Sequence, residues 1–321
     1  MRFDVCALGE LLVDMTECGV SEKGNRLIEA NPGGAPCNVL AMLSRLGKTT
    51  AFIGKVGDDS FGMMLRSTAD ELGICTEGLV TDKTVHTTLA FVHNYPGGER
   101  DFTFYRSPGA DMMLSESEVN MSIITDSRIF HFGSLSMTDE PCRAATRKAV
   151  ETAKASGCII SFDPNLREPL WKSLDAAREQ IGYGISVCDV LKISDNEITW
   201  FMDESDPFKA AEKLKKKYAV PLVFVTLGKD GSMAFSGSCF AKHPGFCVES
   251  VDATGAGDTF MGCALNYIAE KGISDLNENA LSEILRSANA AAAIVTTKHG
   301  AMRSMPETEE IAALINTQKD R

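Results

Sequence analysis

Short apolar runs alternate with stretches of helical periodicity along most of the chain, and this alternation constrains the fold more than any other feature. Strands separated by helices of this length predict a mostly parallel sheet with helices on both faces, an α/β fold. In such sheets ligands bind beyond the carboxyl ends of the strands. The expected strands cover residues 3–9, 50–57, 128–135, 157–163, 188–194 and 221–228, and the clearest helical patterns cover 140–157 and 206–219.

One region departs from the alternation. Two β-rich runs within residues 84–111 are joined by "NYPGGE", which is a hairpin signal. Segments 11–19 and 25–34 also resemble strand and turn rather than helix. We therefore predict one domain over residues 1–321, with a small β-sheet lid formed by about 11–33 and 84–110.

Charge and cysteine usage exclude several classes of protein. The chain has 44 acidic and 32 basic residues, and its longest basic block, "KLKKKY" at 213–218, fits the exposed face of one helix. Nucleic-acid binding needs a clustered basic surface, so we expect no nucleic-acid partner. The ten cysteines lack C-x-x-C spacing, which argues against zinc and favours reduced thiols. With neither a signal sequence nor a membrane-length apolar stretch, we expect a cytoplasmic protein without a membrane partner.

Two nucleotide-binding motifs fail on inspection. "GKTT" at 47–50 resembles the end of a P-loop, but Met42 stands where the motif needs glycine, and a helical pattern precedes it. "GAGDTF" at 255–260 begins like a dinucleotide fingerprint, but Phe260 replaces the last glycine. A nicotinamide-dependent oxidoreductase is therefore a weak alternative.

The stretch "VDATGAGDTFMGCAL" at 251–265 joins an expected strand at 246–252 to an apolar helix. The first N–H groups of a helix have no internal partner, and the helix dipole is positive there. Small residues allow an anion to approach these groups, which predicts a hole of phosphate size. The residues concerned are Ala253, Gly255, Ala256 and Gly257, with Asp258 in the first turn.

Asp258 has two interpretations. As a dipole-compensating acid it would contribute roughly 0.3–1 kcal/mol. Such an acid does not need glycines before it, however. A base that accepts a hydroxyl proton beside a hole for phosphoryl charge explains both the acid and the glycines.

Two long stretches of the sequence resemble the signatures of one protein family. "DATGAGDTF" resembles the C-terminal signature of the ribokinase-like (PfkB-type) carbohydrate kinases, and "GGAPCNVLAMLSRLGKTTAFIGKVGDDSFG" at 33–62 resembles their N-terminal signature. The resemblance covers nearly the whole chain. Within the family, "FTFYRSPGADMML" and "FDPNLREPLW" are most similar to fructokinases of plant and bacterial type.

The resemblance implies a role for each matching position. Asp258 would be the base, with Gly255, Ala256 and Gly257 as the anion hole. The sugar would be bound by Asp14, Gly33, Gly34 and Asn38, by Arg106 from the lid, and by Arg167, which could also meet the nucleotide phosphates. ATP would be bound by Thr226, Gly228, Gly231 and Asn289. Glu197 would organise Mg²⁺ through water, and Asp252 and Thr254 with segment 291–300 would surround K⁺.

Several of these positions have a purely structural interpretation as well. Arg106 could be a surface charge at a strand end, and Glu197 a helix-start acid. The glycines after 226 could form a plain tight turn. The alanine-rich helix at 288–301, which holds Asn289, could simply allow close packing. Ser194 also stands where the family often has Asn.

The predicted activity is ATP-dependent phosphorylation of the primary hydroxyl of D-fructose to fructose 6-phosphate. A kinase for 2-keto-3-deoxygluconate, ribose or a nucleoside remains an alternative, as does a catalytically inactive sugar-binding relative. The lid sheet would need cover on its exposed face, so a homodimer through the lid is expected.

Overall fold

The computed structural model describes residues 1–94 and 100–318, which contain two β-sheets. Neighbouring strands of the larger sheet run parallel except at β11–β12 and β12–β13, which confirms the predicted α/β class. In spatial order the strands are β13 (Cys239–His243), β12 (Ser232–Ser236), β11 (Leu222–Thr226), β10 (Val190–Ser194), β9 (Ile159–Asp163), β8 (Ser127–Gly133), β1 (Phe3–Leu8), β4 (Thr50–Gly57) and β5 (Ile74–Asp82).

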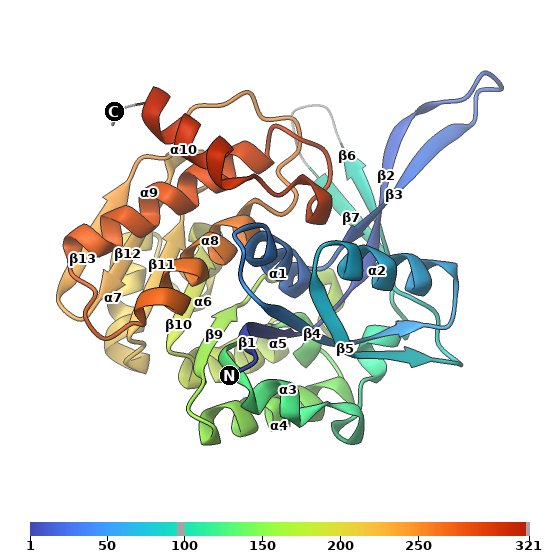
Figure 1. Ribbon diagram of the computed structural model, residues 1–321, viewed down its shortest axis with the longest axis horizontal. Helices are drawn as coiled ribbons and strands as arrows, with labels where there is room; N and C mark the ends of the chain where they lie inside the picture. The colour runs from blue at the N-terminus through green and yellow to red at the C-terminus, as the bar shows by residue number, and fades with distance from the viewer. Residues whose placement is uncertain (95–99, 319–321) are drawn as a thin grey trace.

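Helices pack on both faces of this sheet (Figure 1). Successive side chains of a strand point to opposite faces, and in β1 the residues Val5 and Ala7 belong to one apolar cluster while Cys6 and Leu8 belong to the other. On the first face lie α1 (Ala35–Arg45), α2 (Ser60–Glu71), α8 (Ala256–Lys271), α9 (Glu278–Val295) and α10 (Thr308–Thr317). On the second lie α3 (Met121–Thr125), α4 (Cys142–Ala155), α5 (Leu174–Val187), α6 (Asp195–Met202) and α7 (Pro207–Tyr218).

The smaller sheet projects away from the main body (Figure 1). Its strands in spatial order are β3 (Arg26–Gly33), β2 (Leu12–Val20), β6 (Leu89–Asn94) and β7 (Arg100–Tyr105). The β6–β7 pair is antiparallel, as the hairpin signal predicts, although most of the predicted turn "NYPGGE" lies outside the described residues. The parallel β2–β6 pair brings both predicted β-rich regions into one sheet.

One expected strand is absent, and one expected helix is shorter than predicted. Residues 246–252, predicted as a strand, have no regular secondary structure, because the N–H groups of Val251 and Asp252 donate to the Thr296 carbonyl instead of to a neighbouring strand. Helix α9 ends at Val295 and does not continue to Gly300, which has a left-handed φ of 79°. Thr296, which follows the last residue of α9, also accepts the hydrogen bonds from Val251 and Asp252.

The predictions from cysteine usage and hydropathy can be compared directly with the structure. All ten cysteines are free thiols, and eight of them are buried or half-buried among apolar side chains. Within residues 1–94 and 100–318, no helix is both long and apolar enough to cross a bilayer.

The "GKTT" segment lies in the loop after α1 and leads into β4. Lys48 of this segment bonds Glu270 at the surface, so the segment is not a phosphate loop.

Candidate active site

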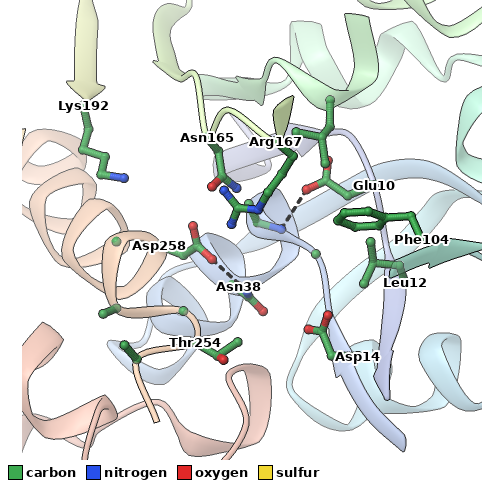
Figure 2. Close-up of a pocket in the computed structure, with 17 residues that line it drawn as sticks. Glu10, Leu12, Asp14, Asn38, Phe104, Asn165, Arg167, Lys192, Thr254 and Asp258 are labelled. Atoms are coloured by element: carbon green, nitrogen blue, oxygen red, sulfur yellow. Dashed lines mark hydrogen bonds between the residues drawn. The ribbon is translucent and has the colours of Figure 1, made fainter. Parts of the chain in front are cut away.

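A cavity of about 360 Å³ lies between the carboxyl edge of the large sheet, the N-termini of α1 and α8, and the small sheet. Figure 2 shows Lys192 and Asp258 at one end, Glu10, Leu12 and Phe104 at the other, and Arg167 between them. Parallel sheets place ligands at this edge, so the location agrees with the sequence prediction. The lining residues are Glu10, Leu12, Asp14, Gly34, Ala35, Asn38, Phe104, Leu135, Asn165, Arg167, Lys192 and those at 253–258.

The start of α8 forms one wall of the cavity. Gly255 is the N-cap with φ 77°, a left-handed conformation that favours glycine, and no side chain caps the helix. A Cβ on Gly257 would stand 2.7 Å from Nζ of Lys192, so only glycine allows this close approach. The positive end of a helix thus opens onto the cavity with little steric cover, which is the geometry of an anion site.

Asp258 is the third residue of α8 and is 8% exposed. Its Oδ2 accepts a 2.8 Å hydrogen bond from Nδ2 of Asn38, which lies in α1. Burial raises the pKa of Asp258 above its usual value, against the opposing charge of Lys192 and the Asn38 hydrogen bond. A buried, oriented carboxylate with a raised pKa is suited to accept a proton from a hydroxyl group.

Asn38 and Asp14 bring further polar atoms to the cavity. Oδ1 of Asn38 is buried and has no hydrogen-bond partner among the described residues, which leaves it able to accept from a ligand hydroxyl. Asp14 lies in β2, and burial raises its pKa to about 7. Gly34 lines the cavity beside them, whereas Gly33 does not. A Cβ at Gly33 would collide with the Asp14 carboxylate, so Gly33 makes room for that side chain.

The loop after β9 carries Arg167 over the cavity, as predicted (Figure 2). Its Nη1 donates to the Leu166 carbonyl at 3.1 Å, and its charge lowers the pKa of both Asp14 and Asp258. The neighbouring N–H of Leu166 donates to Oε1 of Glu197 at 2.7 Å. This bond fixes the loop that presents Arg167.

Glu197 lies at the start of α6, outside the cavity. Ser194 and Glu197 form a capping box at the start of α6, in which Oε2 of Glu197 accepts from the N–H and hydroxyl of Ser194 at 2.8 Å each. With the Leu166 bond, both carboxylate oxygens of Glu197 have protein partners, and the residue does not line the cavity. Glu197 therefore acts as a helix-start acid, and its contact with Mg²⁺ through water stays a prediction. The described part of the chain also holds no cluster of three or more His, Cys, Asp or Glu side chains that could bind a metal by themselves.

Arg106 does not line the cavity that holds Asp258, and its predicted contact with the sugar stays a prediction. Its side chain is only 2% exposed, so the alternative of a surface charge is wrong. Its guanidinium forms a salt bridge with Asp111 and donates to the Thr138 hydroxyl and the Leu135 carbonyl. Because Leu135 lines the cavity, Arg106 supports its wall from behind. The Asp111 partner lies in a short 3₁₀ helix that the local sequence did not predict.

The four positions predicted to bind ATP do not line this cavity. Thr226 ends β11, and Gly228 and Gly231 have left-handed φ values of 56° and 88° in the turn that follows. A Cβ on Gly231 would clash with the backbone around Pro244, so this glycine is required for packing. Nδ2 of Asn289 donates to the Ser232 hydroxyl and the Leu285 carbonyl at 2.6 Å each, which ties α9 to β12.

Asp252 joins two loops beside α8. Its Oδ1 accepts from the N–H of Thr254 at 2.8 Å, and its Oδ2 accepts from the N–H of Gly300 at 3.2 Å. Asp252 therefore contacts both Thr254 and Gly300, which belongs to the predicted segment 291–300, and Thr254 also lines the cavity. Carboxylate and backbone oxygens are the donor types that suit a hard cation.

The sequence did not predict three polar residues of the cavity wall, namely Glu10, Asn165 and Lys192. Lys192 carried a usable signal, because it is a charge between the apolar Leu191 and Ile193 within the expected strand 188–194. Asn165 follows β9 and has φ 45°, which Asn tolerates better than most residues. Glu10 is 3% exposed, and its burial depends on tertiary packing that local sequence does not reveal.

An α/β sheet with a buried carboxylate beside an uncapped helix N-terminus, in a cavity rich in hydroxyl-binding groups, defines an enzyme of the small-molecule phosphotransferase class. Comparison with known proteins narrows this class. The family model described as "pfkB family carbohydrate kinase" matches residues 2–308, so the chain belongs to that family.

Individual relatives are similar over the whole chain. The probable fructokinase-2 of Arabidopsis thaliana is 40% identical over 316 residues, which is 98% of this chain and 96% of the relative. The fructokinase of Xylella fastidiosa with bound ATP has a TM-score of 0.89 and 31% identity, with 100% of each chain covered. The fructokinase of Vibrio cholerae O395 with bound fructose, ADP and calcium has a TM-score of 0.87 and 29% identity, covering 98% of this chain and 99% of that one.

Proposed function

We propose that the protein is an ATP-dependent fructokinase that phosphorylates the primary hydroxyl of D-fructose. The observation that carries the proposal is the Asn38–Asp258 hydrogen bond at the uncapped N-terminus of α8, inside a cavity of about 360 Å³. Membership of a carbohydrate-kinase family and the fructokinase relatives support the substrate class. The structural neighbours that hold ATP, or fructose with ADP, support the same pair of substrates.

The cavity suggests how the reaction proceeds. Asp258 accepts the proton of the sugar O6 as this oxygen attacks the γ-phosphorus in line, and the bond from that phosphorus to the β-phosphate oxygen breaks. The N–H groups around Gly255, Ala256 and Gly257 bind the charge on the transferred group. Asp14, Asn38 and the Gly34 backbone hold sugar hydroxyls, with Arg167 beside the phosphates. Holding both reactants in line removes much of the entropic barrier.

The implied metal ions fit the site to different degrees. Mg²⁺ usually takes one or two carboxylates with phosphates and waters, and it supplies positive charge to the phosphate oxygens when bound with ATP. Glu197 has both oxygens engaged, so contact with Mg²⁺ would be through water. Asp252, Thr254 and segment 291–300 would hold K⁺, because the Asp252 carboxylate already links Thr254 to Gly300. Thr226, Gly228, Gly231 and Asn289 would lie along the nucleotide.

The small sheet would act as a lid over a single domain. Leu12 and Phe104 from this sheet line the cavity, so closure there would exclude water, the competing nucleophile. Val20, Leu27 and Ile28 are 63%, 45% and 44% exposed on the projecting β2–β3 pair. A homodimer that covers these side chains through the lid is the expected assembly, in the cytoplasm.

The decisive experiment measures ADP release from ATP and Mg²⁺ with fructose, glucose, ribose, 2-keto-3-deoxygluconate and adenosine, each with K⁺ or Na⁺. A high kcat/KM for fructose alone supports the proposal. Preference for another compound keeps the mechanism and changes the substrate. Sugar binding without turnover would instead identify a sugar-binding relative that has lost its chemistry.

A further inference from the structure

Lys192 is a buried lysine that the mechanism above does not use. It lies in β10 between apolar residues, its side chain is 7% exposed, and its Nζ bonds Oδ2 of Asp163 at 2.9 Å. Asp163 ends the neighbouring strand β9 and is itself 2% exposed. Burying a lysine is costly unless it is paired or has a function.

The position of the ammonium group distinguishes this pair from an ordinary core salt bridge. Lys192 lines the cavity, and its Nζ would be 2.7 Å from a Cβ on Gly257, which places it against the first turn of α8 (Figure 2). Its charge is also the strongest opposing influence on the buried Asp258 carboxylate. The ammonium therefore lies beside both the base and the anion hole.

We propose that Lys192 is a catalytic residue whose ammonium group donates a hydrogen bond to a non-bridging oxygen of the phosphoryl group during its transfer. This proposal rests on the kinase activity proposed for the same cavity. An ammonium group has three donors, and the described residues provide one side-chain acceptor, Asp163, at hydrogen-bond distance. Donors on Lys192 thus remain for a ligand that reaches the α8 N-terminus.

The step balances without a change in the protonation of Lys192. The bond from O6 to the γ-phosphorus forms, the bond to the β-phosphate oxygen breaks with its electron pair going to ADP, and the O6 proton passes to Asp258. Burial lowers the pKa of Lys192, but the charge of Asp163 and other carboxylates outweighs this and holds the pKa above its ordinary value. Lys192 therefore stays charged, and Asp163 acts as the positioning residue that directs it.

The chain offers a matched control in Lys55. Its side chain is 8% exposed in β4, and its Nζ bonds Asp82 at 2.9 Å and Glu118 at 2.8 Å, but it does not line the cavity. Lys55→Met therefore tests what loss of a buried lysine does to stability alone. Removing one partner of such a pair is strongly destabilising wherever it lies.

The experiment compares Lys192→Met, Lys192→Arg and Lys55→Met with the wild type. It measures kcat, KM for fructose and ATP, melting temperature, and binding of ADP with Mg²⁺, aluminium fluoride and fructose, a mimic of the transferring phosphoryl group. For Lys192→Met we expect kcat to fall by at least about 100-fold, fructose KM to stay within about threefold, and binding of the mimic to weaken with kcat. Lys192→Arg should recover part of the loss, and Lys55→Met should keep kcat within about threefold.

The opposite results have separate meanings. If the wild type is active and Lys192→Met keeps kcat within about threefold of the wild-type value, Lys192 does not have the proposed role. The proposed function then stays intact. An inactive wild type that binds no mimic removes both proposals. If Lys192→Met does not fold, the double variant Asp163→Asn with Lys192→Met leaves no unpaired buried charge and carries the same test.

Discussion

Nδ2 of Asn38 donates a 2.8 Å hydrogen bond to Oδ2 of Asp258, which joins α1 to α8 across 220 positions of the chain. The two helices pack closely at Gly262, where a Cβ would come within 2.7 Å of the Met42 side chain. This packing fixes the bond, so the orientation of the carboxylate is set by the fold and not by local sequence. Both side chains line the cavity.

Asn38→Ala should lower kcat by about 10- to 100-fold, because Asp258 loses its orienting donor. The Asn38 hydrogen bond lowers the pKa of Asp258, so its removal should also shift the acidic limb of the pH–rate profile upward. Measuring kcat from about pH 5 to pH 9 checks both effects. The exposed Asn279→Ala serves as the control. An unshifted profile with normal kcat would mean that Asn38 does not act on the base.

Asp258→Asn should reduce turnover by at least about 100-fold while fructose and ATP still bind. The same change should leave the melting temperature at neutral pH unchanged or higher, since burial disfavours the ionised carboxylate. Calorimetric binding, steady-state kinetics and thermal unfolding separate these effects, with the exposed Asp275→Asn as a control. Near-normal turnover in Asp258→Asn would remove this residue as the base.

The sequence predicts those parts of the site that depend on neighbouring residues. The alternation of apolar runs predicts the sheet, and the small residues before Asp258 predict the uncapped helix start that the structure contains. A helix N-terminus is a local feature, because its N–H groups and its dipole arise from consecutive residues. This explains why the segment 253–258 could be placed without knowledge of the fold.

Other parts depend on partners that are distant in sequence or hidden by the fold. The sequence does not reveal the partners of Arg106, because Asp111 and the Leu135 carbonyl meet its guanidinium only in the folded chain. The 246–252 segment has apolar character but bonds a single carbonyl at Thr296. The charge of Lys192 stands out in an apolar strand, but the sequence does not indicate that this side chain faces α8. Such features depend on tertiary packing, which overrides local pattern.

Arg106→Ala should act mainly on stability. Its guanidinium and the Asp111 carboxylate are each 2% exposed, and removal of one partner leaves a buried charge unpaired, which costs about 3–5 kcal/mol. Denaturant unfolding measures this loss, and Arg26→Ala, whose side chain is 73% exposed, is the control. A normal unfolding free energy with a raised fructose KM would instead place the guanidinium in the sugar site.

Glu10 should make the ligand-free protein less stable as pH rises. Its Oε1 accepts from the N–H of Ala35 at 2.9 Å, while Oε2 is buried with no hydrogen-bond partner among the described residues. Burial raises the pKa of this carboxyl from 4.5 to about 7. Below the pKa of 4.5, the Glu10 carboxyl is protonated in both the folded and the unfolded state, and its contribution to stability is fully present.

Between the two pKa values the folded state binds more protons than the unfolded state, so stability falls with rising pH. A difference of about 2.5 pKa units, at about 1.4 kcal/mol each, gives a loss of about 3 kcal/mol, complete above about pH 7. Glu10→Gln removes the titrating group but keeps an oxygen for the Ala35 N–H. We therefore expect the unfolding free energy of Glu10→Gln, relative to that of the wild type, to increase by up to about 3 kcal/mol from about pH 4 to pH 8.

Unfolding in denaturant at both pH values provides the test. Asp14 has a pKa raised to about 7 by burial as well, so Glu10→Gln should flatten the pH dependence of stability without abolishing it. The exposed Glu22→Gln should follow the wild-type curve. If Glu10→Gln and the wild type change in parallel across this range, the Glu10 carboxyl is not protonated in the folded protein, and its orphan oxygen must instead be solvated from the cavity.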